Sequence, residues 1–166
     1  CVNVSCYTIT YWFEIMETVF LPDEAAAVQF AREWADCLTA PCVVYLLGDL
    51  GAGKTTFARG LLRGMGYDGA VKSPTYALVE SYAFSDKTIH HFDLYRFSSP
   101  DEWDDAGLGE LFASDSIGLI EWPQQGRGFV PAADLIFEFS VCGQGRNCTV
   151  SAQSETGKRS VDLWQN

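Results

Sequence analysis

The chain has 166 residues, of which 48% are hydrophobic and 20% charged, as in a globular protein large enough to bury a core. Its formal net charge of −11 disfavours direct binding to nucleic acid, because no local basic patch offsets the repulsion from phosphates. No apolar stretch approaches the roughly 18 residues that cross a bilayer, so we expect no membrane association.

We interpret residues 1–15 as a non-native or mis-started N-terminal extension, with Met16 as the plausible initiator. The extension contains no Lys or Arg and therefore lacks the basic start of a signal peptide. The 6 cysteines of the chain form no C-x-x-C pair and no zinc-like spacing with histidine, which favours a reduced, cytoplasmic protein. Residues 16–166 are expected to fold as a single domain.

A strand is predicted over residues 17–21, after which Asp23 caps a helix that extends to about Leu38. Pro41 follows the helix, and the apolar run 42–47 then indicates a buried strand. The segment that follows this strand is the most informative one in the sequence.

Residues Gly48–Thr55 match the phosphate-binding pattern G-x-x-x-x-G-K-[ST] in full. The segment lies between the buried strand and a helix predicted over 55–63, which is the context that the motif requires. In such a loop the backbone N–H groups and the helix N-terminus hold phosphates. Lys54 is expected to reach the β- and γ-phosphates, and the Thr55 hydroxyl to ligate Mg²⁺. The sequence therefore predicts a protein that binds a nucleoside triphosphate.

Five more strands are predicted, over residues 77–84, 89–95, 116–120, 135–141 and 147–152. The first two should form a hairpin, and so should the last two. Between these pairs, a short helix is expected to stop near Gly107. Helices alternate with strands early and strands dominate late, which predicts an α/β fold: a three-layer P-loop NTPase with a mixed parallel/antiparallel sheet flanked by helices.

Two acids could complete a metal–nucleotide site. Glu121 follows the strand over 116–120, and Asp93 follows residues 89–92, so both should emerge at the carboxyl edge of the sheet, where ligands bind in open α/β folds. Either acid could instead be solvated or cap a helix. The residues alone leave open which of the two contacts the metal.

Other polar residues near these motifs have weaker support. Thr75 lies where related NTPases place a switch segment, so its hydroxyl could join Mg²⁺ or sense the γ-phosphate, although it could equally be a turn residue. His90 and His91 alternate across a strand, so at most one faces any site, and a structural role is the default for each. Trp122 is expected to be a packing residue.

Four blocks of sequence together closely resemble the bacterial TsaE family, formerly called YjeE: Gly48–Thr56, Lys72–Tyr76, His91–Arg96 and Ile120–Pro123. The resemblance covers about residues 18–152. It implies a small ATPase required for threonylcarbamoyladenosine formation in tRNA. Such an ATPase binds a TsaB–TsaD complex and resets it through Mg²⁺-dependent hydrolysis of ATP, and it meets tRNA only indirectly, through these partners.

The resemblance also implies roles for individual residues. The triphosphate would be held by Leu50, Gly51, Ala52, Gly53, Lys54 and Thr55. Thr55 and Glu121 would ligate Mg²⁺, and Asp93 would be the acid required for hydrolysis. Thr75 would belong to the switch-like loop and Glu24 would lie near the adenine.

Lys54, Asp93 and Thr75 are accordingly the predicted catalytic residues. Basal hydrolysis should be weak, because no arginine is clearly placed to stabilise the transition state.

Two other functions stay open. The chain could be a nucleotide-gated binding module whose hydrolysis is not essential, or a small-molecule kinase with Asp93 as the base that positions the acceptor. A GTPase is disfavoured because the guanine-reading run Asn-Lys-x-Asp is absent.

Overall fold

The computed structural model of the protein describes residues 14–166, with side chains from residue 17 onward. The interpretation of residues 1–15 therefore falls almost entirely outside the described part. The strands are β1 (Glu14–Leu21), β2 (Cys42–Leu47), β3 (Val79–Ala83), β4 (Thr88–Asp93), β5 (Ser116–Glu121), β6 (Leu135–Cys142) and β7 (Gly145–Ala152). The α-helices are α1 (Glu24–Glu33), α2 (Lys54–Gly64), α3 (Glu102–Asp105) and α4 (Glu155–Gln165), and two 3₁₀ turns are η1 (Leu108–Leu111) and η2 (Pro123–Gly126).

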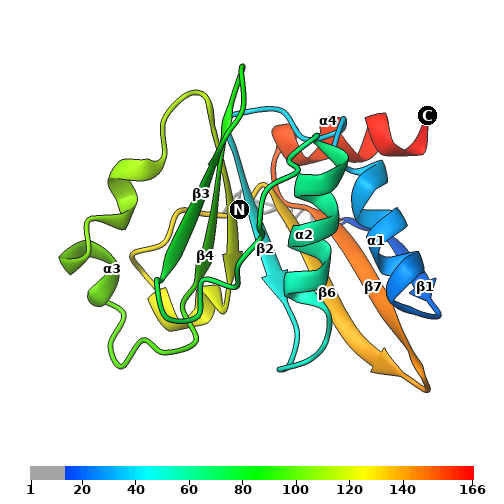
Figure 1. Cartoon of the computed structure of the whole chain (residues 1–166), viewed down its shortest axis with the longest axis horizontal. Helices are drawn as coiled ribbons and strands as arrows, with labels where there is room; N and C mark the ends of the chain where they lie inside the picture. The colour runs from blue at the N-terminus through cyan, green and yellow to red at the C-terminus, as the bar shows by residue number, and fades with distance from the viewer. Residues whose placement is uncertain (1–13) are drawn as a thin grey trace, which may run out of the picture.

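The strands form one seven-stranded sheet in the order β1-β7-β6-β2-β5-β4-β3 (Figure 1). The four central strands β6, β2, β5 and β4 run parallel, and β3 adds antiparallel at one edge while β7 and β1 add antiparallel at the other. The mixed sheet and both hairpins are thus confirmed. Because parallel strands end at one edge, the carboxyl ends of β2, β5 and β4 lie together, and Asp93 is paired directly with Glu121.

Helices and turns cover both faces of this sheet, so the predicted three-layer architecture is confirmed. On one face, α1 and α2 pack over a large apolar cluster that includes Phe30, Trp34 and Phe57. On the other face, α3 and η1 contribute to a smaller cluster. Side chains alternate between the two faces along each strand: Leu119 of β5 belongs to the large cluster, and Ile120 to the small one.

Several predicted boundaries are wrong, each for a local reason. Asp23 does cap α1, accepting a hydrogen bond from the Ala26 N–H at 2.8 Å, but the helix ends at Glu33 and turns fill the segment to residue 37. The strand predicted from residue 77 begins at Val79, because Leu78 has a left-handed φ of 65°.

The strand predicted over 89–95 ends at Asp93. The Asp93 carboxylate accepts a hydrogen bond from the Tyr95 N–H at 3.0 Å, which is an Asx turn and so directs the chain out of the sheet.

The C-terminal helix α4 was not predicted from the sequence. Ser154 caps it, accepting a hydrogen bond from the Gly157 N–H at 3.2 Å. Its Trp164 ring stacks on Trp34, the C-cap residue of α1, with centroids 5.0 Å apart. Ser154 followed by Glu155 is a helix-start signal that could have indicated it. Within residues 14–166, no helix is long and apolar enough to span a membrane.

Candidate nucleotide-binding site

The loop Gly48–Thr55 joins the carboxyl end of β2 to the N-terminus of α2, as the motif requires. Gly48 has a φ of 139°, and a Cβ there would lie 2.6 Å from the Phe139 carbonyl oxygen on β6. Gly53 has a φ of 110°, but a Cβ there would meet nothing within 4 Å. Packing and backbone conformation both require glycine at the first position. At Gly53 only the backbone conformation requires glycine. The space beside Gly53 is open, as a phosphate-binding loop needs.

A cavity of about 300 Å³ opens beside this loop. It is lined by Leu50, Gly51, Ala52, Gly53, Lys54, Thr55, Thr56, Ser73, Thr75, Asp93, Glu121 and Trp122. The fold therefore brings together every predicted site residue except Glu24, from four separate segments of the chain.

Lys54 is the buried cation of this cavity, with only 5% of the residue exposed. Its Nζ donates a hydrogen bond to the Asp49 carbonyl oxygen at 2.9 Å and another to the Gly48 carbonyl oxygen, and it lies 4.4 Å from the centroid of the Trp122 ring. Burial lowers the pKa of Lys54, while the charges of Glu121, Asp93 and Asp49 oppose that shift. Trp122 is thus more than the packing residue expected from the sequence, since it lines the cavity and contacts Lys54.

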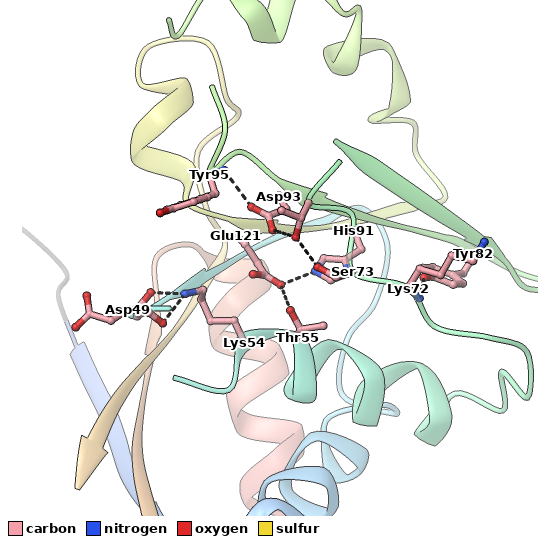
Figure 2. Close-up of polar contacts among 12 residues, drawn as sticks. Asp49, Lys54, Thr55, Lys72, Ser73, Tyr82, His91, Asp93, Tyr95 and Glu121 are labelled. Carbon is pink, nitrogen blue, oxygen red and sulfur yellow. Dashed lines mark hydrogen bonds and ion pairs between the residues drawn. The ribbon is translucent and has the colours of Figure 1, made fainter. Parts of the chain in front are cut away.

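Glu121 is the acid next to the loop, and it is almost fully buried at the end of β5. Its Oε1 accepts a hydrogen bond from the Thr55 hydroxyl at 3.1 Å, so the two predicted metal ligands are in contact (Figure 2). The same oxygen lies 2.8 Å from Nε2 of His91, which is fully buried. The default structural interpretation of His91 therefore overlooked a direct contact with the site.

Asp93 forms a second, neighbouring set of contacts. Its Oδ2 accepts a hydrogen bond from the Thr75 hydroxyl at 3.1 Å, and the Thr75 hydroxyl lies 2.7 Å from that of Ser73. Figure 2 shows this chain of contacts beside the Glu121 set. The segment around residues 72–76 is thus tied to the end of β4 through Asp93, and its role as a switch-like loop stays a prediction.

The donor set fits a nucleotide-bound magnesium ion better than an independent metal site. Residues 17–166 contain no group of three or more His, Cys, Asp or Glu side chains that could hold a metal. Thr55 and Glu121 offer two adjacent oxygens instead. Mg²⁺ commonly takes one or two protein oxygens and completes its shell with water and substrate phosphates.

Glu24 lies in a second cavity of about 200 Å³, which shares Gly51, Gly53 and Thr56 with the first. Its carboxylate is 3.8 Å from the Arg59 guanidinium, and both side chains are exposed. Across this cavity, Arg146 of β7 donates a hydrogen bond to the Gly51 carbonyl oxygen at 3.2 Å. The second cavity thus adjoins the first along the phosphate-binding loop, and Glu121 does not line it. The role of Glu24 beside an adenine stays a prediction.

Comparison with known proteins gives concordant matches. The family model for threonylcarbamoyl adenosine biosynthesis protein TsaE matches residues 21–148. The chain is similar to the tRNA threonylcarbamoyladenosine biosynthesis protein TsaE of Haemophilus influenzae, with 43% identity over 90% of this chain and 98% of that protein. It is 42% identical to the protein of the same name from Bacillus subtilis, over 61% of each chain.

The fold has a solved counterpart as well. The crystal structure of Bacillus subtilis YdiB superposes with a TM-score of 0.76, covering 90% of this chain and 93% of that chain at 23% identity. The four sequence blocks, the loop geometry and the family match agree, and the chain belongs to the TsaE family of threonylcarbamoyl adenosine biosynthesis proteins.

Proposed function

We propose that this protein is a Mg²⁺-dependent ATPase that acts in the formation of threonylcarbamoyladenosine in tRNA. The observation that carries the proposal is the convergence of Lys54, Thr55, Asp93 and Glu121 on one cavity beside a complete phosphate-binding loop. The names of the relatives supply the pathway.

Each residue has a distinct role in this proposal. The loop from Leu50 to Thr55 holds the triphosphate, and Lys54 moves from its own loop carbonyls to the β- and γ-phosphates when these offer stronger, charged acceptors. Thr55 and Glu121 hold Mg²⁺, which neutralises charge on the phosphates when bound. Glu24 and the second cavity take the nucleoside end of ATP.

Asp93 is the acid that we assign to hydrolysis. Two hydrogen bonds, from Thr75 and from the Tyr95 N–H, fix the orientation of its carboxylate at the cavity wall. A carboxylate held in this way can order a water molecule for attack on the γ-phosphate, with Thr75 coupling it to the loop over 72–76. No arginine lines this cavity among residues 17–166. We therefore expect slow basal turnover that a protein partner accelerates.

The partner in this proposal is a TsaB–TsaD-like complex, which the ATPase binds and resets through its hydrolytic cycle. A net charge of −11 is consistent with a protein that leaves tRNA binding to its partners.

The test is ATP hydrolysis by the purified protein, alone and with a TsaB–TsaD pair from the same organism. We expect the pair to stimulate turnover, and Lys54→Ala and Asp93→Ala to abolish the gain. Lys158→Ala and Asp162→Ala, which change the same residue types on the exposed side of α4, are the matched controls and should retain it.

The outcomes separate the alternatives. If the pair binds and Asp93→Ala abolishes hydrolysis but still supports threonylcarbamoyladenosine formation, the protein is a nucleotide-gated binding module. If the pair neither binds nor stimulates, the role in tRNA modification is wrong, and release of ADP on addition of metabolites would then indicate a kinase.

A further inference from the structure

Within the described residues, the His91 side chain makes one hydrogen bond, and its partner is an acid of the proposed metal site. It is fully buried on β4, and its Nε2 lies 2.8 Å from Oε1 of Glu121. Its other ring nitrogen, Nδ1, is buried without a partner in this part of the chain. An ionised carboxylate only accepts hydrogen bonds, so Nε2 is the protonated ring nitrogen and donates a hydrogen bond to Glu121.

The neighbouring histidine shows what a structural role looks like in the same strand. His90 points to the opposite face of the sheet, where Nδ1 lies 2.7 Å from the Ser81 hydroxyl and Nε2 lies 3.5 Å from the Ser116 hydroxyl. Both of its ring nitrogens have partners. Leaving one polar atom of a buried imidazole unpaired costs free energy. The bond to Glu121 is therefore the evident reason for a histidine at position 91.

The charges around Glu121 explain why this carboxylate needs to be held. The Lys54 ammonium lies in the same cavity and interacts electrostatically with Glu121. A carboxylate with Thr55 as its only hydrogen-bond donor would be freer to turn toward that charge. Hydrogen bonds from Thr55 and His91 converge on the same oxygen and keep it beside the Thr55 hydroxyl.

We infer that His91 is a positioning residue for the metal–nucleotide site: it holds Glu121 in place so that Glu121 and Thr55 together bind the Mg²⁺ of the nucleotide. This inference rests on the proposed function. It assigns His91 no contact with the nucleotide itself, so loss of its hydrogen bond should weaken the contribution of Mg²⁺ and leave metal-independent binding intact.

The experiment measures the affinity for a fluorescent N-methylanthraniloyl ATP by equilibrium titration, in Mg²⁺ and in EDTA. In His91→Leu we expect affinity in EDTA to be unchanged, and the gain given by Mg²⁺ to fall by about 10- to 100-fold. His91→Gln should restore most of the gain, because the glutamine amide nitrogen reaches about as far as Nε2. His91→Asn should not, because its amide is too short. His90→Leu is the matched control and should keep the full gain.

Two results would overturn the inference. One is a folded His91→Leu protein that keeps the full Mg²⁺ gain. The other is an equal loss in His91→Gln and His91→Asn, which would indicate packing alone. Thermal melting of each variant monitors folding, and if His91→Leu does not fold, the glutamine and asparagine variants decide the question. The proposed function fails separately, and the inference with it, if the wild-type protein binds the probe in neither condition.

Discussion

The two faces of the sheet differ in the size of their apolar clusters and in their chemistry. Under α1 and α2, aromatic side chains form a continuous layer in which Phe57 lies 4.6 Å from Phe137 and 6.0 Å from Phe30, measured between ring centroids. Under α3 and η1, a smaller cluster is built around Phe92, Trp103 and neighbours.

The buried polar groups are divided just as unequally. Asp93, Glu121 and His91 belong to the face under α2, whereas His90 and the hydroxyl it contacts on Ser116 belong to the other face. The charged site therefore lies on the face of the sheet that carries the large cluster. Burial of the acids and of Lys54 there is tolerated because each has hydrogen-bond partners: Lys54 donates to carbonyl oxygens of the loop, and each acid accepts from neighbouring side chains or backbone.

Phe57→Ala should show the largest difference between the faces. Phe57 of α2 is fully buried in the large cluster, so its truncation should reduce the free energy of unfolding by about 4 kcal/mol. Chemical denaturation measures this, with Phe129→Ala, at a 41% exposed position, as the control. A loss close to that of the control would show that the large cluster does not carry the stability we assign to it.

Leu108→Ala tests the small cluster on the other face in the same way. Leu108 is buried in the small cluster, where surrounding turns can collapse into the space, so we expect a loss of only about 2 kcal/mol. Nucleotide affinity should be unchanged, because no residue of η1 lines either cavity beside the loop. A marked fall in affinity with the fold intact would contradict the separation of the two faces.

Gly60→Ala probes how closely α1 and α2 approach each other over the large cluster. A Cβ at Gly60 would lie 2.8 Å from the Cβ of Ala31 and 3.0 Å from the Val28 carbonyl oxygen. The clash should exceed the gain in helix propensity and destabilise the protein by about 1–2 kcal/mol. Adding Ala31→Gly should relieve part of the clash. A double-mutant cycle by denaturation would reveal that coupling, and strict additivity would count against the close crossing.

His90→Gln should give the smallest effect, visible only as a change in pH dependence. Burial lowers the pKa of His90 below its ordinary value of 6.5, and the charge of Asp115 only partly opposes this. As pH falls below 6.5, the unfolded chain takes up the proton first, so wild-type stability is lost between 6.5 and the lower folded pKa. Melting temperatures from pH 8 to 5 should fall less steeply in the variant. Identical slopes would show that His90 does not contribute.

Local sequence was enough to predict the elements that carry strong patterns. The buried strand over 42–47, the phosphate-binding loop and the strand that delivers Glu121 were all predicted because apolar runs and a glycine-rich motif are local signals. Boundaries failed where a single side chain or dihedral angle ended an element, as at Leu78 and Asp93. Helix α4 was missed because its apolar side depends on a distant partner, Trp34.

By itself, the sequence determined the family, the fold class and the residue types of the site, because a phosphate-binding loop needs fixed spacing along the chain. Only the tertiary structure decided which side chains meet. The parallel register places Asp93 beside Glu121, and strand alternation turns His91 toward that acid and His90 away from it. Asp93 and Glu121 are 28 positions apart and His91 and Glu121 are 30 apart, so these contacts depend on how strands pair rather than on any local pattern.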